Sequence, residues 1–170
     1  MTLAEPPSDD LYRAVIGAPS QEFYLSYFRR ADARGYAPIS WHWPVFVVGL
    51  FWLLYRKQYR FALIVFGLPY LVAMVAAVLD SVLPGSGRPL LAIAVGAFGF
   101  AWLPLNANGI YYRWARSEID RACAEFPGQR DAQLRRLEAR GGVNGQLPYV
   151  ILVSFMVFSI LAGSFSRLGQ

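Results

Sequence analysis

The chain has 170 residues, of which 56% are apolar and 16% are charged, and its formal net charge is +5. This composition differs from that of an ordinary soluble domain of similar length and favours a membrane protein, in which basic residues serve topology and headgroup contact rather than nucleic-acid binding. A single cysteine and a single histidine exclude an internal disulfide, a multi-histidine metal site and a Ser-His-Asp triad within one chain.

The N-terminal region divides into a mobile segment and a helix. Residues 1–19 are polar and contain prolines, which predicts a mobile segment, although residues 11–16 could form a short turn. An amphipathic helix is expected over 20–35, because aromatic residues from Phe23 to Phe28 recur at helical spacing. We expect Ser20 to cap this helix and Gly35 to end it.

The stretch 41–59 predicts a short helix that is re-entrant or lies at a membrane interface. Its apolar core, 43–55, spans about 20 Å as a helix, which is too short to cross a bilayer comfortably. A crossing would also place Arg56, Lys57 and Arg60 outside, against the positive-inside rule. A helix that does not cross is therefore favoured over one that does.

Three longer apolar stretches, at 61–83, 89–105 and 147–165, predict transmembrane helices, since a crossing needs about 20 residues. Cytoplasmic helices are expected over 108–140, with a break at Pro127 and Gly128. The predicted fold is therefore an all-α polytopic membrane protein with three transmembrane helices, one short re-entrant or interfacial helix and cytoplasmic amphipathic helices. Residues 20–170 form its single membrane domain.

The basic residues predict the orientation of this fold. All 16 Lys and Arg residues except Arg88 and Arg167 lie before the first long apolar stretch or between the second and the third. Because Lys and Arg are enriched on the cytoplasmic side, we expect a cytoplasmic N-terminus and an outward C-terminus.

Two stretches carry a resemblance to a known family. The first reads Ser40-Trp41-His42-Trp43, followed by Trp52-Leu53-Leu54-Tyr55-Arg56-Lys57-Gln58-Tyr59, and the second runs from Asn106 to Arg116. They resemble a family of small bacterial inner-membrane proteins of unknown function, whose signature is Ser-Trp-Asn-Trp followed by Trp-Leu-Leu-Tyr-Arg-Lys-Met-Tyr. His42, Pro44 and Gln58 depart from that signature, where Asn, Ala and Met are usual. The resemblance covers roughly 20–120. It implies a multi-pass location in the bacterial inner membrane, with the outward C-terminus in the periplasm, and it implies no reaction.

Aromatic and basic side chains make up the candidate contact site for a lipid or a partner. Its predicted members are Trp41, His42, Trp43, Tyr55, Arg56, Lys57, Tyr59, Arg60, Tyr111, Tyr112, Arg113 and Arg116. The basic cluster at 56–60 can simply mark topology. Alternatively, it forms a defined pocket for an anionic lipid or partner, closed by Tyr55 and Tyr59. His42 can be a hydrogen-bonded imidazole or a proton-sensitive switch.

No catalytic constellation, metal-ligand spacing or phosphate-binding loop is found, so no enzyme and no cofactor is predicted. The first hypothesis is a non-enzymatic structural or accessory subunit that acts through helix–helix and lipid contacts. Its expected partners are anionic membrane lipids, further copies of itself or a larger inner-membrane complex, and no nucleic acid. The alternative hypothesis is a channel or transporter formed by oligomerisation.

Overall fold

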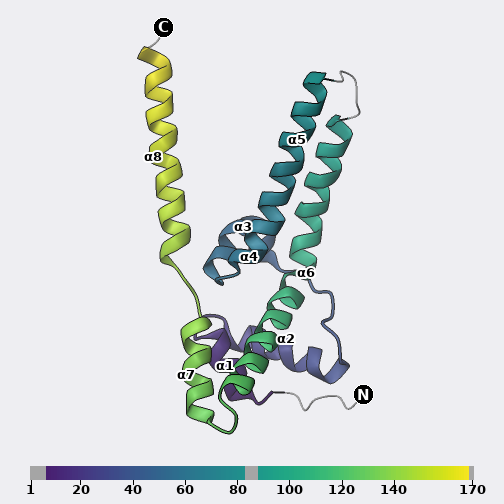
Figure 1. Cartoon of the computed structure of the whole chain (residues 1–170), viewed down its shortest axis with the longest axis vertical. Coiled ribbons are helices and arrows are strands. Elements are labelled where there is room, and N and C mark those ends of the chain that lie inside the picture. The colour runs from purple at the N-terminus through teal and green to yellow at the C-terminus, as the bar shows by residue number, and fades with distance from the viewer. Residues whose placement is uncertain (1–6, 83–87, 169–170) are drawn as a thin grey trace.

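The computed structural model describes residues 7–82 and 88–168, and every regular element within these ranges is a helix (Figure 1). A helical body lies at the bottom of the view, a helical hairpin rises from it, and the C-terminal helix rises separately. The elements in chain order are α1 (Asp9–Ile16), α2 (Gln21–Arg34), α3 (Trp43–Tyr55), α4 (Tyr59–Ala62), the π-helix η1 (Leu63–Gly67), α5 (Leu68–Val82), α6 (Arg88–Glu125), α7 (Arg130–Arg140) and α8 (Gln146–Leu168).

The first helix, α1, is a packed part of the body. Its buried side chains recur at helical spacing and are Leu11, Tyr12, Val15 and Ile16. They face α7, α2 and α6, and their removal from water favours docking of the helix. The prediction of a mobile segment over 1–19 is therefore wrong for residues 9–16, whereas residues 1–6 lie outside the described part of the chain.

Helix α2 occupies the stretch 20–35 expected for it. It ends at Gly35, whose left-handed φ of 72° is favourable for glycine, as predicted. Ser20 stands at the N-cap position, but its φ of 58° is also left-handed and its side chain caps no N–H group. The expected side-chain cap is therefore wrong. The aromatic face is buried, with Tyr24 and Phe28 each 2% exposed or less.

Helix α6 runs without a break through the expected boundary near residue 106. Pro104 lies inside the helix and has no N–H group, yet the helix continues on both sides of it. The carbonyl groups of Pro104 and Leu105 accept hydrogen bonds from the backbone N–H groups of His42 (3.0 Å) and Ser40 (3.2 Å). This part of α6 therefore holds the segment that leads into α3.

The C-terminal half of α6 joins the body through charge pairs as well as apolar contacts. The side chain of Glu118 is 3% exposed and forms salt bridges with Arg121 at 2.6 Å and Arg136 of α7 at 3.1 Å. At the end of α7, the N–H of Gly142 donates to the carbonyl of Val15 at 3.0 Å. Helix α7, at the expected 130–140, is thus tied to both α6 and α1.

Among the described residues, no helix combines the length and the apolarity needed to cross a membrane. This finding contradicts the expected polytopic fold with crossings at 61–83, 89–105 and 147–165 and a re-entrant helix at 41–59. It equally contradicts the multi-pass inner-membrane location with a cytoplasmic N-terminus and a periplasmic C-terminus.

The physical reason is clearest in the first two expected crossings. Stretch 61–83 is divided among α4, η1 and α5, and the 15 residues of α5 span only about 22 Å, against a hydrocarbon core of about 30 Å. Stretch 89–105 is one part of α6, whose remainder carries charged residues and packs into the body.

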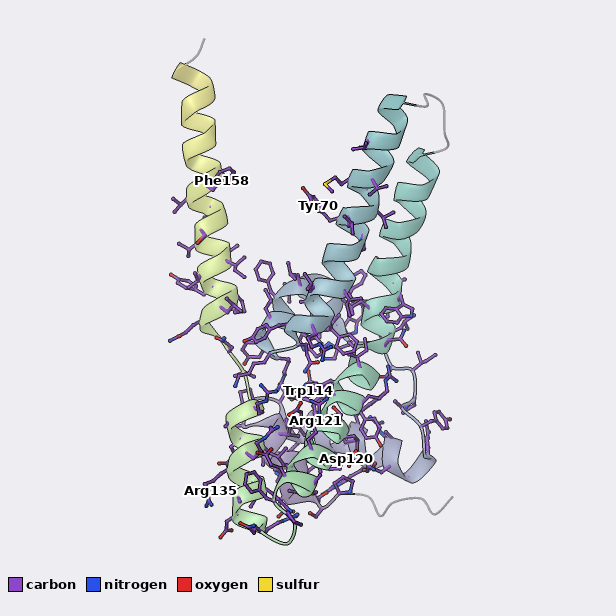
Figure 2. All side chains as sticks on the ribbon, viewed as in Figure 1. Tyr70, Trp114, Asp120, Arg121, Arg135 and Phe158 are labelled. Atoms are coloured by element: carbon purple, nitrogen blue, oxygen red, sulfur yellow. The ribbon has the colours of Figure 1, made fainter. Side chains whose placement is uncertain are left out.

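Apolar side chains on α5 and α8 nevertheless remain exposed (Figure 2). Tyr70 on α5 is 74% exposed and Phe158 on α8 is 69% exposed, and these helices stand on opposite sides of the view. The buried core lies below them, where α1, α2, α3, α6 and α7 meet.

Candidate functional site

The start of α3 is built around His42. The Nδ1 atom of His42 accepts a hydrogen bond from the backbone N–H of Val45 at 3.2 Å, so the side chain caps the helix. The preceding segment is fixed against α6 by the two backbone bonds described above and by Asn108, whose Nδ2 donates to the Ser40 hydroxyl at 2.8 Å. His42 is thereby held 2% exposed beneath the aromatic residues beside it.

Helix α3 then changes direction at Val48, whose φ of −132° and ψ of 39° are not helical. Beyond this kink, Trp52 and Arg56 lie four residues apart and share one face of the helix. Both are buried, and this face lies over α2 and α6. The kink therefore separates a first half that is mostly exposed, with Trp43 66% exposed, from a second half that is partly or fully buried.

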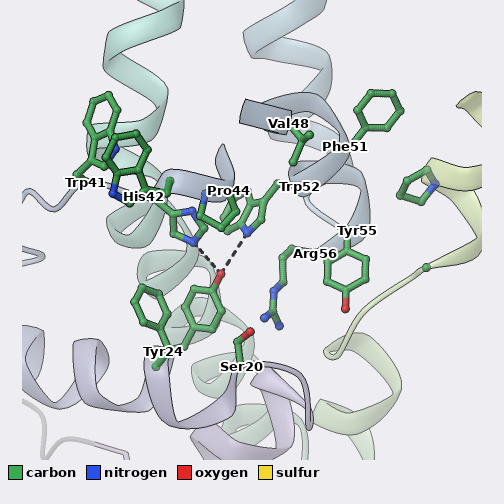
Figure 3. A pocket seen from close by; sticks show the side chains of 14 residues that line it. Ser20, Tyr24, Trp41, His42, Pro44, Val48, Phe51, Trp52, Tyr55 and Arg56 are labelled. Atoms are coloured by element: carbon green, nitrogen blue, oxygen red, sulfur yellow. Dashed lines mark hydrogen bonds between the residues drawn. The ribbon is translucent and has the colours of Figure 1, made fainter. Parts of the chain in front are cut away.

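Three buried side chains from different segments form one hydrogen-bond network around the Tyr24 hydroxyl. Its oxygen lies 2.9 Å from Nε2 of His42 and 3.1 Å from Nε1 of Trp52 (Figure 3). Burial lowers the pKa of His42 from 6.5 to about 4, so the ring is neutral at pH 7. Because Nδ1 accepts from Val45, the hydrogen-bond pattern assigns the ring proton to Nε2.

The hydrogen bonds around the Tyr24 hydroxyl show which groups supply their protons. His42 and Trp52 both donate to the Tyr24 oxygen, so this hydroxyl acts as the acceptor in both bonds. Burial raises the pKa of Tyr24, so the hydroxyl keeps its own proton. That proton remains a donor that neither of the two neighbours uses.

Arg56 is the buried cation of the site. Its Nη1 donates to the carbonyl of Ile16 at 3.1 Å and its Nη2 donates to that of Pro19 at 2.8 Å. Its guanidinium carbon lies 4.4 Å from the ring centre of Tyr24 and 5.3 Å from that of Tyr111. Its Nε is buried without a hydrogen-bond partner. Within the described ranges, the recorded salt bridges do not include Arg56.

These elements enclose a pocket of about 690 Å³, the α2–α3 pocket (Figure 3). Arg56 extends from the end of α3 toward Ser20, while Tyr24 points up between His42 and Trp52. Gly145 and Pro148, just before and within the start of α8, complete one side. The lining residues are Ser20, Phe23, Tyr24, Trp41, His42, Trp43, Pro44, Val48, Phe51, Trp52, Tyr55, Arg56, Gly145 and Pro148.

The structure brings together only part of the predicted site. Five of its members line the α2–α3 pocket, namely Trp41, His42, Trp43, Tyr55 and Arg56. Tyr111 lies directly behind them, with its ring 4.9 Å from that of Tyr24. Burial raises the pKa of Tyr111.

Lys57, Tyr59 and Arg60 are not among the residues that line the pocket. Lys57 adopts a left-handed φ of 57° and its Nζ donates to the carbonyl of Gly141 at 2.6 Å. The Tyr59 hydroxyl accepts from Nδ2 of Asn144 at 3.1 Å. Both residues thus contact the linker between α7 and α8, and Arg60 is exposed on α4.

Tyr112 and Arg116 belong to a separate cluster around Asp32. The Asp32 carboxylate accepts hydrogen bonds from the hydroxyls of Tyr112 at 2.6 Å and Tyr12 at 2.8 Å, and from Arg116 at 3.2 Å. Burial raises the pKa of Tyr112 to about 12. Arg113, three residues before Arg116 on α6, is exposed.

Sequence reasoning missed Tyr24, Trp52 and Phe23 as site residues. Tyr24 and Phe23 were attributed only to the aromatic face of a helix, because their partners His42 and Arg56 lie far along the chain. The sequence does contain a signal for Trp52: it lies one helical turn before Arg56, so the two residues share a helix face. No group of three or more His, Cys, Asp or Glu residues within the described ranges could hold a metal ion.

Comparisons with known proteins identify the family to which the chain belongs. Among curated proteins no relative matches the chain. Among solved structures no similar fold is found. A family model described as "Protein of unknown function (DUF2628)" matches residues 21–116, a range that contains α2, α3 and the buried Arg56. Because this match covers more than half of the 170 residues, the chain belongs to this family of proteins of unknown function.

Proposed function

We propose that this chain is a non-enzymatic accessory protein that takes up the apolar part of a lipid-like molecule in the α2–α3 pocket. The observation that carries the proposal is the pocket, whose volume of about 690 Å³ lies within the range of about 300–1,000 Å³ common for small-molecule sites. Rings of Phe23, Phe51 and Trp52 line it, and burial of an apolar chain against such rings is favourable.

The polar groups of the pocket support binding rather than catalysis. A general base needs a nitrogen or oxygen that is free to accept a proton from a substrate. Both ring nitrogens of His42 are already engaged, Nδ1 with the backbone of Val45 and Nε2 with Tyr24. The lowered pKa of His42, about 4, further weakens it as a base near neutral pH.

The pocket is tested with a neutral apolar fluorophore, N-phenyl-naphthylamine, whose emission rises on transfer from water to an apolar site. We expect saturable binding to the purified chain. Val48→Trp should reduce binding at least about tenfold, because a bulky ring then fills the pocket that Val48 lines. Val47→Trp is the matched control, since Val47 is 73% exposed and does not line the pocket. Absence of saturable binding, or an equal loss in both variants, would contradict the proposal.

Helix–helix docking between copies of this chain is the second proposed contact. It is favoured by the exposed apolar side chains of α5 and α8, which would lose water contact at an interface. Among the described residues of these two helices, the aromatic side chains that remain mostly exposed are Tyr70, Tyr149 and Phe158. A chain that docks in this way would act as an accessory subunit of its own oligomer.

Native mass spectrometry of the gently purified complex tests this second contact. We expect a discrete homo-oligomer that Phe158→Glu dissociates, because a charge in an apolar interface lacks a partner. Glu138→Lys on α7, an exposed position of the body, is the control and should leave the oligomer intact. A monomer, or an oligomer unaffected by Phe158→Glu, would contradict docking through α8.

A further inference from the structure

The ion pairs of the helical body make Arg56 stand out. Arg116 pairs with Asp32 and Arg136 pairs with Glu118, so these partly buried cations each have a carboxylate partner. Arg56 is 2% exposed, yet within the described ranges its guanidinium meets two carbonyl oxygens and three aromatic rings. A buried cation without a counter-ion is costly, and an anion bound beside it would remove that cost.

The guanidinium group has donors left for such an anion. It carries five N–H groups, of which the carbonyls of Ile16 and Pro19 use one on each Nη atom. The Tyr24 ring covers one face, so further hydrogen bonds run in the guanidinium plane. Because the Nε atom is shielded from solvent, an anion reaches the group through the Nη hydrogens on the side that lines the pocket.

The Tyr24 hydroxyl supplies a further donor in the same pocket. Its oxygen accepts from His42 and Trp52, so the hydroxyl proton is directed away from both. Tyr24 and Arg56 both line the pocket, with the guanidinium carbon 4.4 Å from the centre of the tyrosine ring, and both offer hydrogens. A ligand group that only accepts hydrogen bonds and carries negative charge fits this arrangement.

The net charge of the residues that line the pocket limits which anions it can balance. Arg56 is the cation among the residues that line the pocket, and the neutral His42 adds no charge. A single negative charge balances it, whereas a dianionic phosphate monoester would leave one charge unpaired in an apolar site. The remaining lining is mainly aromatic and apolar, which fits a hydrocarbon chain behind the charged head.

We propose that the α2–α3 pocket binds an amphiphilic carboxylate of the fatty-acid class, whose carboxylate accepts hydrogen bonds from Arg56 and the Tyr24 hydroxyl while its chain lies among the aromatic rings. The inference rests on the proposed function, because it names the ligand class of the same pocket. It adds that the head group, and not only the chain, is recognised.

The experiment compares ligands with one chain length and different heads on the unaltered protein. Dodecanoate, dodecanol and dodecyl phosphate each compete with N-phenyl-naphthylamine at about pH 8, where a carboxylic acid carries one charge and a phosphate monoester about two. We expect dodecanoate to bind at least about tenfold more tightly than dodecanol, as charge-assisted hydrogen bonds predict. Dodecyl phosphate should bind more weakly than dodecanoate, and acetate should not displace the fluorophore.

Two variants assign the preference to Arg56. Arg56→Met keeps an apolar stem of similar length and removes the charge, so the ratio between the dodecanoate and dodecanol affinities should fall to near one. Lys57→Met is the matched control, because Lys57 is the adjacent cation and its Nζ is bound to Gly141 outside the pocket. It should keep the wild-type ratio. If Arg56→Met does not fold, the ligand series on the unaltered chain still tests whether the carboxylate head group is recognised.

The outcomes separate the two proposals. Failure of N-phenyl-naphthylamine to bind would contradict the proposed function itself. If the fluorophore binds but dodecanoate and dodecanol have equal affinities, the proposed apolar binding pocket is supported and the carboxylate inference is overturned. Tighter binding of dodecyl phosphate than of dodecanoate would overturn the assignment to a monoanion, and displacement by acetate would overturn the requirement for a chain.

Discussion

The guanidinium carbon of Arg56 lies 4.4 Å from the ring centre of Tyr24, which joins the end of α3 to the first turns of α2. The Tyr24 hydroxyl meets His42, the N-cap residue of α3. One tyrosine that lines the α2–α3 pocket thus contacts the residues that cap both ends of α3. The predictions below test this arrangement and the packing of the body that supports it.

Removing the Tyr24 hydroxyl should destabilise the fold. In Tyr24→Phe, the N–H groups of His42 and Trp52 lose their acceptor while they remain buried. We expect the free energy of unfolding to fall by about 1–3 kcal/mol, the usual cost of leaving buried donors unpaired. Urea denaturation measures the change. Tyr59→Phe, at a hydroxyl on a 44% exposed residue, is the control, and an equal loss in both would contradict the network.

His42 should make stability depend on pH in a defined window. Burial, and then repulsion by Arg56, lower the pKa of His42 from 6.5 to about 4. Between these values the unfolded chain protonates His42 and the folded chain does not, so the unfolded state binds more protons. The free energy of unfolding therefore decreases as the pH falls from about 6.5 to about 4, by up to about 3 kcal/mol.

His42→Asn isolates this contribution, because asparagine also accepts a hydrogen bond at a helix N-cap and does not titrate. Urea denaturation at several pH values should show a wild-type stability that decreases more steeply with acid than that of the variant. Carboxylates titrate in both proteins and cancel in the difference. Parallel pH profiles would show that His42 is not held neutral by the fold.

Gly141 should tolerate no side chain. A Cβ atom at Gly141 would overlap the carbonyl of Val15, where α7 meets α1. Backbone atoms cannot move aside cheaply, so we expect Gly141→Ala to lower the free energy of unfolding by about 2–4 kcal/mol. Gly145→Ala is the matched control, because a Cβ there meets open space. Equal melting temperatures of the two variants would contradict the close contact.

Replacing the Asp32 carboxylate should destabilise the fold. In Asp32→Ala, Arg116 loses its ion-pair partner and the hydroxyls of Tyr12 and Tyr112 lose their acceptor. We expect a loss of about 2–4 kcal/mol in the free energy of unfolding. Asp120→Ala, at an exposed position of α6, should change stability by less than about 0.5 kcal/mol. A loss no larger than this control would show that the cluster contributes little.

Local patterns predicted several helices well because their signals lie within one or two turns. The aromatic spacing from Phe23 to Phe28 indicated α2, and Gly35 ended it as expected. Helix α7 likewise lies between a Pro-Gly break and a pair of glycines. For α6 the same reasoning failed, since contacts with the segment that contains Ser40 and His42 support the helix around Pro104 and a local rule does not include them.

The prediction of transmembrane helices was also wrong because it rested on local sequence alone. Apolar content alone did not reveal that 61–83 divides into three elements or that 89–105 continues into a helix packed in the body. The prediction of a pocket beside Arg56 had a better basis, because Tyr55 and Arg56 are neighbours and both line the pocket. Its expected closure by Tyr59 was wrong, since that side chain contacts the linker before α8.

The helical class and the bounds of α2 and α7 follow from periodicity and composition, and so does the concentration of aromatic and basic residues around 41–57. Which of those residues line one pocket depends on tertiary packing. Tyr24 meets His42 and Arg56 through contacts between residues 18 and 32 positions apart, and such contacts depend on how whole helices pack. That Arg56 has no carboxylate partner within the described ranges is likewise a property of its three-dimensional surroundings, because burial and partners, not residue type, set the cost of a charge.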